Sequence, residues 1–498
     1  MTTLLLTGGI GGDGARLDLR CDTATGLVLE RGRALVPRMH RADAGESVDG
    51  DEGLDSADRR YLSGAEQVVD CTGLVLLPAP VEPHAHLDKA LSGDAAPNPA
   101  GDLPGAIAAW RAHRATLDDE DLARRAREAA LELVAHGTTT IRTHVDVGPG
   151  IGLRGLDVLV ALREELRADG LCDLQLVALV TPPVTGPAGT EGAQMRALLR
   201  EAMARGADVV GGCPHVDPDP VAATAELVAI ADELGLPLDL HVDEQLAPGA
   251  LWVRDLAAGV AARDAAATSG SAPADGAGSA ALGPAASAAR PALAAVRPTL
   301  GGRTVASHCV SLGVQDPETQ ARIAAELAAA GVAVVTLPQT NLYLQARDRP
   351  SSPPRGLTAI RALLDAGVVV AAGADNVRDP FNAVGRSDAM ETAALLVMAA
   401  HLTPAEAWHA VSTAARAAIG LPATELQPGQ PAEVLALRGT SLTDAMARAS
   451  DERVVVHRGR VVASTVLTTV LRPLPAAASS GAPAGATSPV TPTHHALA

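Results

Sequence analysis

Short apolar runs alternate with helix-like segments along the middle of the chain. The runs are rich in Val, Leu and Ile at consecutive positions, which is typical of strands buried on both faces of a sheet. Eight such runs occur, at 73–87, 138–147, 173–180, 207–216, 237–242, 304–309, 332–338 and 368–374. Ala-, Leu-, Arg- and Glu-rich segments between them predict helices at 118–136, 155–169, 194–205, 220–234, 316–330 and 356–366.

This succession of strand–helix units predicts a (β/α)8 TIM barrel over residues 73–424. A doubly wound open sheet is the main alternative, but no GxGxxG-type loop follows any of the runs. Residues 1–72 and 425–473 contain short strand-like stretches separated by turns. We therefore expect a small β-sandwich domain formed by both ends of the chain.

Three segments differ in composition from the rest of the chain. Residues 38–62 are acidic and rich in Gly, Asp and Ser, which predicts a surface loop. Residues 264–298 and 474–498 consist largely of Ala, Gly, Ser and Pro. Such segments lack the large apolar groups that pack a core. We expect a low-complexity insertion at the first and a disordered tail at the second.

Charge and cysteine content narrow the function classes. The 498-residue chain has a formal net charge of −18, which argues against nucleic acid and anionic membranes as partners. Its five Cys contain no CxxC motif, so a disulfide framework is not expected. We see neither a signal-peptide pattern nor a long apolar span. These features predict a cytoplasmic protein and leave open whether it forms homo-oligomers.

The composition also identifies informative residues. Lys89 is the only Lys among 40 Lys and Arg residues, Asn occurs four times, and Phe, Tyr and Trp together number six. A global composition bias accounts for such scarcity. Rare residue types that remain in spite of this bias are candidates for functional positions.

Histidines gather at the predicted strand ends, which is where barrel enzymes carry their active sites. His84 and His86 form an HxH motif, and alternation along a strand points both rings to the same side. His241 ends the fifth run and Asp375 follows the eighth. Three imidazoles and a carboxylate suit one divalent ion, Zn²⁺ or Fe²⁺, with a coordination position left open.

Motifs at these strand ends resemble the amidohydrolase superfamily, in particular its cytosine deaminase-like branch. The resemblance covers about residues 70–425 apart from the insertion. The segments that carry it are VEPHAHLD (81–88), IRTHVDV (141–147), GADVVG (206–211), LHVDE (240–244), ASH (306–308), PQTNLYLQ (338–345), RGLT (355–358) and DNVRDPF (375–381).

The resemblance implies a role for each matched residue. His84, His86, His241 and Asp375 would hold one divalent metal ion, and Asp375 would also take a proton from the metal-bound water. His308 would hydrogen-bond the metal-bound hydroxide or the developing oxyanion. Glu244 would carry the proton to the ring nitrogen beside the carbon under attack. These roles belong to a deaminase that releases ammonia or an amine.

The lone Lys bears on the number of metal ions. Binuclear members of this superfamily usually bridge two metals with a carbamylated Lys from the fourth strand, and the run at 207–216 contains no Lys. A single metal ion is therefore expected. Lys89 lies just past the HxH motif, three residues after His86, and a surface cation in this Arg-rich chain would be Arg. We expect its ammonium to bind a substrate carbonyl or anion, and the His-Leu-Asp-Lys sequence resembles isopropylammelide amidohydrolases.

Three further positions bear on substrate recognition. Thr181 stands in the stretch where cytosine deaminases carry a Gln that reads the cytosine amide edge. Asn376 replaces their second Asp, and Phe381, the only Phe, lies where they place a stacking Trp. The chemistry is thus better supported than cytosine itself as the substrate. His144, Asp146 and His215 also lie at strand ends, and the sequence does not distinguish site roles from structural ones.

Together these features predict a metal-dependent hydrolase that deaminates a small nitrogen heterocycle, with cytosine or a related pyrimidine or triazine as the leading class. The first alternative is an amidohydrolase that cleaves an amide or N-alkylamino group on such a ring. An alternative from another class is a non-catalytic barrel that binds a metal or ligand. The complete set of predicted ligands and proton carriers argues against this last alternative.

Overall fold

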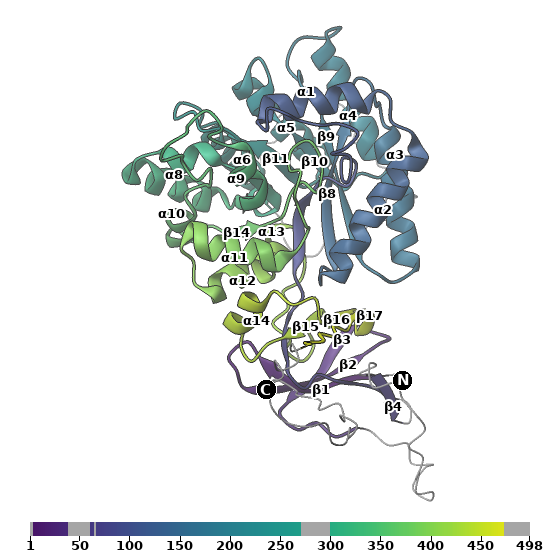
Figure 1. Cartoon of the computed structure of the whole chain (residues 1–498). Helices are drawn as coiled ribbons and strands as arrows, with labels where there is room; N and C mark the ends of the chain where they lie inside the picture. The colour runs from purple at the N-terminus through teal and green to yellow at the C-terminus, as the bar shows by residue number, and fades with distance from the viewer. Residues whose placement is uncertain (1–2, 38–59, 64–65, 270–298, 473–498) are drawn as a thin grey trace, which may run out of the picture.

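The computed structural model describes residues 3–37, 60–63, 66–269 and 299–472. An upper part, built of strands surrounded by helices, stands on a smaller sheet that contains strands from both ends of the chain (Figure 1). The predicted tail at 474–498, and most of the predicted loop and insertion, lie outside the described residues. Among the described helices, none is long and apolar enough to cross a membrane.

The upper part contains one parallel sheet of eight strands in sequential order. A bridge between Ala85 of the first strand and Asp375, which follows the last strand, brings these two strands together, so the sheet closes into the predicted barrel. The strands are β7 (Val81–Ala85), β8 (Thr140–Val147), β9 (Asp173–Val180), β10 (Val209–Gly212), β11 (Leu238–Val242), β12 (Thr304–His308), β13 (Ala333–Thr336) and β14 (Val370–Ala372).

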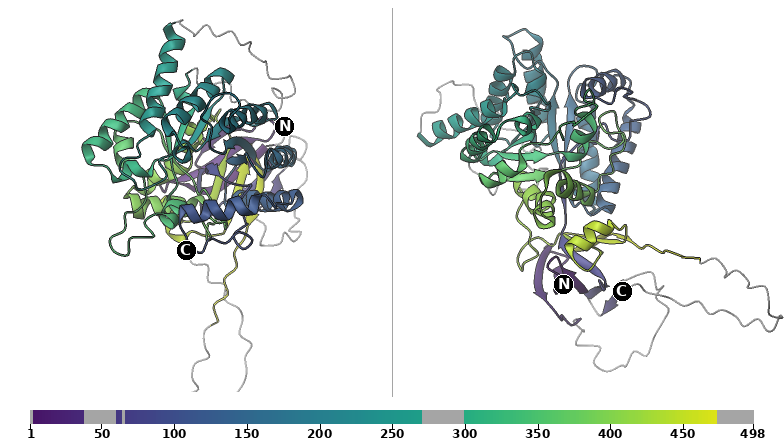
Figure 2. Two further views of the ribbon diagram at one scale, coloured as in Figure 1. Left: turned by 90° about the horizontal axis from the view of Figure 1, so that it is seen from above. Right: turned by 60° about the vertical axis from the view of Figure 1, so that its left-hand side comes forward.

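Helices surround this barrel, as Figure 2 shows from two further directions. Several begin with an Asp or Thr side chain that accepts a hydrogen bond from a backbone N–H of the first turn, which stabilises the helix end. The principal helices are α1 (Leu103–Arg114), α2 (Asp119–Ala135), α3 (Arg154–Ala168), α4 (Glu191–Ala204), α5 (Pro220–Leu234), α6 (Val253–Ser269), α8 (Pro317–Ala330), α9 (Pro338–Leu344), α10 (Ile360–Asp365), α11 (Ala389–Ala400), α12 (Pro404–Val411) and α13 (Thr413–Ala418).

The start of the predicted insertion at 264–298 belongs to the fold. Helix α6 continues to Ser269, so residues 264–269 are helical. The Asp264 carboxylate accepts hydrogen bonds from the backbone N–H groups of Leu300 (2.6 Å) and Gly301 (3.0 Å). Asp264 therefore ties the end of α6 to the chain that leads into β12.

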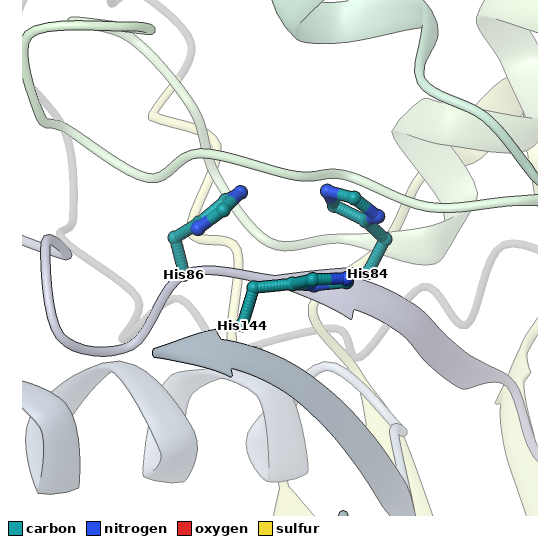
Figure 3. Close-up of side chains that lie close together, drawn as sticks. All are labelled: His84, His86 and His144. Atoms are coloured by element: carbon teal, nitrogen blue, oxygen red, sulfur yellow. The ribbon is translucent and has the colours of Figure 1, made fainter. Parts of the chain in front are cut away.

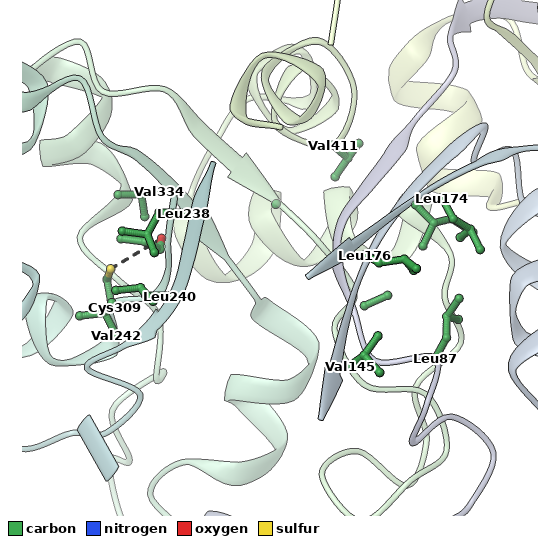
Figure 4. Packing of buried hydrophobic residues seen from close by; sticks show 14 of the residues in the cluster. Leu87, Val145, Leu174, Leu176, Leu238, Leu240, Val242, Cys309, Val334 and Val411 are labelled. Carbon is green, nitrogen blue, oxygen red and sulfur yellow. Dashed lines mark hydrogen bonds between the residues drawn. The ribbon is translucent and has the colours of Figure 1, made fainter. Parts of the chain in front are cut away.

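The core lies between the barrel strands and the surrounding helices. Leu and Val side chains from β8, β9 and β11 are buried there, as expected for strands covered on both faces (Figure 4). Leu238 and Leu240 alternate with Asp239 and His241, so one face of β11 packs against the helices and the other faces the barrel interior. Burying one such Leu side chain contributes about 1.5–3 kcal/mol.

The strands from the two chain ends form one mixed sheet of nine strands, where the sequence predicts a sandwich. The first predicted barrel run divides, because residues 74–78 pair with this sheet and 81–85 with the barrel. The members are β1 (Thr3–Gly11), β2 (Arg16–Asp22), β3 (Leu27–Gly32), β4 (Arg60–Ser63), β5 (Glu66–Asp70), β6 (Leu74–Pro78), β15 (Val434–Arg438), β16 (Arg453–His457) and β17 (Arg460–Thr465).

A buried ion pair connects this terminal sheet to the barrel. Arg453 of β16 donates to both carboxylate oxygens of Asp388, at 3.0 and 2.7 Å, and both side chains are almost completely buried. The same guanidinium donates to the backbone carbonyl of His136 at 2.8 Å. Such bidentate geometry fixes orientation as well as distance, so the two sheets hold a defined relative position.

Candidate metal centre and active site

The four predicted metal ligands meet at the carboxyl end of the barrel. His84 Nε2 lies 3.1 Å from His241 Nε2, which lies 3.3 Å from His86 Nε2. Asp375 Oδ1 is 3.3 Å from His86 Nε2 and 3.8 Å from His84 Nε2. Residues from β7, β11 and the chain after β14, far apart in the sequence, thus direct four ligand atoms to one point.

These distances test whether the residues fit a metal ion. Zn²⁺ is held about 2.1 Å from imidazole nitrogen and carboxylate oxygen, so neighbouring ligand atoms of a tetrahedral site stand about 3.4 Å apart. The observed separations of 3.1–3.8 Å bracket that value. Both oxygens of Asp375 are buried without a hydrogen-bond partner among the described residues. The donor set therefore fits one divalent metal ion.

The electrostatics agree with this geometry. Burial, followed by repulsion from neighbouring cationic groups, lowers the pKa of His84, His86 and His241 well below the usual range. Burial, together with nearby carboxylates, raises the pKa of Asp375 well above its ordinary value. Neutral imidazoles are the form that binds metals, and a buried carboxylate among them calls for a cation.

Glu82, which the sequence did not single out, connects the first and last barrel strands beside the four predicted ligands. Glu82 accepts hydrogen bonds from the backbone N–H of His84 (3.0 Å) and of Ala374 (2.9 Å), which precedes Asp375. Gly373 leaves room for it, since a Cβ at that position would lie 2.3 Å from Glu82 Oε1. Asp375 itself adopts a left-handed backbone with φ 66°. Strained conformations of this kind concentrate at functional sites.

His144 joins the cluster of rings, although the sequence left its role open. Its ring centroid lies 3.9 Å from that of His84, and the residue is fully buried. Figure 3 shows its ring beside those of His84 and His86. The three rings are close enough together to share an ion. His144 Nε2 is also 3.4 Å from Asp239 Oδ1.

The two predicted proton-handling residues lie beside the ligands. Burial raises the pKa of Glu244 to about 8. Its carboxyl oxygens lie 3.6 Å from His308 Nδ1 and 3.8 Å from His215 Nε2. His308 Nδ1 hydrogen-bonds Asn341 Oδ1 at 3.1 Å, which leaves its buried Nε2 without a partner among the described residues. His308 also forms, with His84 and His241, a group of three histidines whose ring nitrogens are close enough together to hold an ion.

A cavity opens next to this centre and contains the predicted substrate-binding residues. Its lining includes Glu244, His308, Asp375 and three of the open or predicted positions, Lys89, Thr181 and Phe381. Helix α1 contributes Leu103, Ile107 and Trp110 to the lining. The cavity therefore combines an apolar wall with a metal-binding edge, which is typical of small-molecule sites.

Lys89, another residue of the cavity lining, is buried among carboxylates. Its Nζ donates to Asp146 Oδ1 at 2.8 Å and lies 3.3 Å from Asp88. Attraction to these carboxylates outweighs burial and raises the pKa of Lys89, so the ammonium stays charged. Trp110 Nε1 (2.7 Å) and Arg114 (3.1 Å) donate to the other oxygen of Asp146. Sequence reasoning missed Trp110 and Arg114, because both lie on α1 away from any strand end.

Asp379 organises the loop after β14. Its carboxylate accepts hydrogen bonds from Asn376 Nδ2 at 2.7 Å and from the backbone N–H of Phe381 at 2.8 Å. Asn376 and Phe381 both line the cavity. On the neighbouring side, Thr181 Oγ1 accepts a hydrogen bond from Arg114 at 3.3 Å. Asp379 was not predicted, although its place in the DNVRDPF segment was available as a signal.

Comparisons with known proteins agree with this geometry. The chain is 30% identical over 389 residues to a pterin deaminase from Rhizobium rhizogenes strain K84, covering 76% of this chain and 78% of the relative. A family model described as "Amidohydrolase family" matches residues 260–463. This chain belongs to the amidohydrolase family.

Solved structures show the same fold. N-isopropylammelide isopropylaminohydrolase from Burkholderia multivorans superimposes with a TM-score of 0.69 at 28% identity, covering 93% of this amidohydrolase and 99% of that chain. A 5-methylcytosine deaminase from Klebsiella pneumoniae gives a TM-score of 0.73 at 23% identity, covering 94% and 99%. These relatives confirm the predicted cytosine deaminase-like branch. They also confirm the predicted enzyme class, a hydrolase that acts on carbon–nitrogen bonds of cyclic substrates.

Proposed function

We propose that this amidohydrolase removes an exocyclic amino group from a nitrogen heterocycle by hydrolysis and releases ammonia. The observation that carries the proposal is the convergence of four ligand atoms at 3.1–3.8 Å with Glu244 beside them at the same cavity. An aminated pyrimidine or triazine remains the leading substrate class. The pterin deaminase relative adds pterins, in which the aminated pyrimidine is fused to a second ring.

The cofactor we propose is one divalent ion, Zn²⁺ or Fe²⁺, held by His84, His86, His241 and Asp375. When bound, the ion would act as a Lewis acid that makes a water molecule acidic enough to react at neutral pH. A Lys-bridged pair of ions is not proposed, because β10 contains no Lys and Lys89 lies after β7.

The side chains around the centre can move the protons that the reaction requires. Asp375 would accept a proton as water adds to the ring carbon. Glu244 would deliver a proton to the ring nitrogen next to that carbon, which prevents a stranded negative charge. Its raised pKa of about 8 keeps the carboxyl protonated near neutral pH. His308 would hydrogen-bond the reacting oxygen with its otherwise unpartnered Nε2.

Substrate binding would use the remaining polar and aromatic groups of the cavity. Lys89 would donate a hydrogen bond to a ring carbonyl, while Thr181 and Asn376 would contact the polar edges of the ring. Phe381 would stack against its face. Their common support is that all four side chains line the same cavity as Glu244.

A second candidate is hydrolysis of an N-alkylamino group or an amide on a similar ring. It is favoured by the fold shared with the isopropylammelide enzyme and by the buried Lys89 of the His-Leu-Asp-Lys sequence. A purely metal-binding barrel without catalysis is disfavoured, since such a protein has no need for a buried carboxyl and Lys89 in the cavity. We also propose a cytoplasmic location, in keeping with five free cysteines.

Product analysis separates these candidates. Purified protein loaded with Zn²⁺ or Fe²⁺ should be incubated with aminated pyrimidines, triazines and pterins, and with their N-isopropyl derivatives. Ammonia release from the amino compounds is the expected result. Isopropylamine release with no ammonia would favour the second candidate. Absence of turnover with every compound, in metal-loaded protein, would contradict both.

A further inference from the structure

A hydrogen-bonded chain of three residues runs from the barrel interior to the metal centre. His84 Nδ1 lies 3.0 Å from Ser307 Oγ, and Ser307 Oγ lies 3.0 Å from Asp239 Oδ1. All three residues are fully buried. This Asp239–Ser307–His84 chain comes from three different barrel strands, and none of the predicted roles includes Asp239 or Ser307.

The direction of each hydrogen bond follows from chemistry. Arg142 Nη1 donates to Asp239 Oδ2 at 2.8 Å, and a guanidinium stays charged in a protein interior. Asp239 is therefore a carboxylate, which can only accept. Ser307 has one proton and must donate it to Asp239. Its oxygen can then only accept from the imidazole, so His84 must carry its proton on Nδ1.

This direction matters because a metal binds an imidazole nitrogen that carries no proton. With the proton on Nδ1, His84 Nε2 has a free lone pair, and Nε2 is the atom that lies 3.1 Å from His241 Nε2. The opposite tautomer would place a proton at the position of the ion. The chain thus determines whether His84 can act as a ligand.

The base of the chain is itself held in place. Arg142 also donates to Gln175 Oε1 at 3.0 Å and to the backbone carbonyl of Ile419, the residue that caps the end of α13, at 3.2 Å. These contacts fix the guanidinium and hence the Asp239 carboxylate. Rigid support of this kind is what orients ligands in metal sites.

We propose that Asp239 and Ser307 are positioning residues that hold His84 in the one tautomer able to bind the metal ion. The inference rests on the proposed metal site and not on the identity of the substrate. It can therefore be tested by metal binding alone, in protein that is given no substrate.

The first test removes the link. Ser307→Ala should weaken Zn²⁺ binding by about 10- to 100-fold, the usual effect of losing a partner behind a metal ligand. Ser307→Thr retains the hydroxyl and should bind Zn²⁺ like the wild type. Ser412→Ala is the matched control, because its buried hydroxyl donates to the backbone carbonyl of Trp408 and takes no part in the chain. It should leave Zn²⁺ affinity unchanged.

The second test reverses the chain. In Asp239→Asn the amide oxygen is required by Arg142, so the amide NH₂ faces Ser307 and donates to it. Ser307 must then donate to His84 Nδ1, which moves the imidazole proton to Nε2. We expect a loss of Zn²⁺ affinity larger than in Ser307→Ala. Adding Ser307→Ala to Asp239→Asn removes the reversed donor and should restore affinity toward that of Ser307→Ala alone.

Affinity is measured on metal-stripped protein by competition with a chromophoric chelator, with circular dichroism as the check of folding. A merely structural role predicts that the double variant binds no better than Asp239→Asn. That result, or Zn²⁺ affinities of Ser307→Ala and wild type within twofold, would overturn the proposal. If Asp239→Asn does not fold, the Ser307→Ala and Ser307→Thr pair still decides. Failure of ammonia release would affect the proposed function and not this inference.

Discussion

Glu244 provides the most informative single substitution, because Gln has nearly the same shape but cannot deliver a proton. The carboxyl oxygens lie 3.6 Å from His308 Nδ1 and 3.8 Å from His215 Nε2, beyond hydrogen-bond distance. Gln therefore breaks no short contact of this side chain. We expect Glu244→Gln to change the free energy of unfolding by about 1 kcal/mol or less near pH 4, where both the carboxyl and the amide are neutral.

The expected effect on turnover is much larger. General acid–base catalysis contributes about 10²- to 10⁴-fold, which corresponds to about 3–5 kcal/mol of activation free energy at 1.36 kcal/mol per factor of ten. We therefore expect kcat for ammonia release to fall by that factor, with Zn²⁺ content unchanged. The assay couples ammonia release to a dehydrogenase, and metal content is measured on the same sample.

A matched control separates this effect from general damage. Glu226→Gln changes a carboxylate on α5 whose side chain is 41% exposed, and it should leave kcat unaltered. A kcat of Glu244→Gln within fivefold of the wild type would contradict proton delivery by Glu244. Loss of Zn²⁺ from Glu244→Gln in proportion to the fall in kcat would contradict it as well.

Four further outcomes are expected. Asp375→Ala should fold but bind no Zn²⁺, and its activity should fall by more than about 10³-fold. Metal analysis and circular dichroism of the same sample check this, and retained metal would contradict the role of Asp375 as a ligand. Lys89→Arg should lower kcat/KM for the best substrate. Lys89→Met removes the ammonium from Asp88 and from one oxygen of Asp146, and it should lower the free energy of unfolding by about 3–5 kcal/mol in urea titrations. Wild-type values for both variants would contradict these roles of Lys89. Phe381→Ala should raise KM by about tenfold through lost stacking, with kcat little changed; an unaltered KM would exclude that contact. In metal-free protein, burial raises the pKa of Glu244 from an ordinary 4.5 to about 8, so the folded state favours the protonated carboxyl. The resulting contribution to the free energy of unfolding is fully present below pH 4.5 and is lost as pH rises through about 8. Urea titrations of Glu244→Gln between pH 5 and 8 should therefore show a decline shallower by up to about 1.4 kcal/mol per pH unit, and parallel profiles would contradict the raised pKa.

The barrel, and the meeting of the four proposed metal ligands at one point, could be predicted from the sequence because they leave local signals. A strand buried on both faces reads as a continuous apolar run, and a polar residue that ends such a run marks the carboxyl edge of the sheet. His84, His86, His241 and Asp375 follow this rule and meet in space. The spacing of these residues along the chain does not show that they meet, because only the closure of the barrel brings Asp375 next to Ala85.

Residues that act through tertiary contacts could not be located in the same way. Trp110 and Arg114 reach Asp146 from a helix, and no strand-end pattern identifies them. The division of the run at 73–87 between two sheets was hidden, because only two residues separate β6 from β7 and the stretch 74–81 is apolar without a break. Asp239 did leave a trace, as a charged residue inside a buried strand two positions before His241. Such a residue must be paired in the interior.

The central claim is that one metal ion at this centre supports hydrolytic deamination. The most direct measurement is a titration of metal-stripped protein with Zn²⁺ or Fe²⁺ while ammonia release from an aminated pyrimidine, triazine or pterin is recorded. Activity should be absent at first, rise in proportion to added metal and reach its plateau at one equivalent per chain. Ammonia release by fully stripped protein, or a plateau that requires two equivalents, would contradict the account.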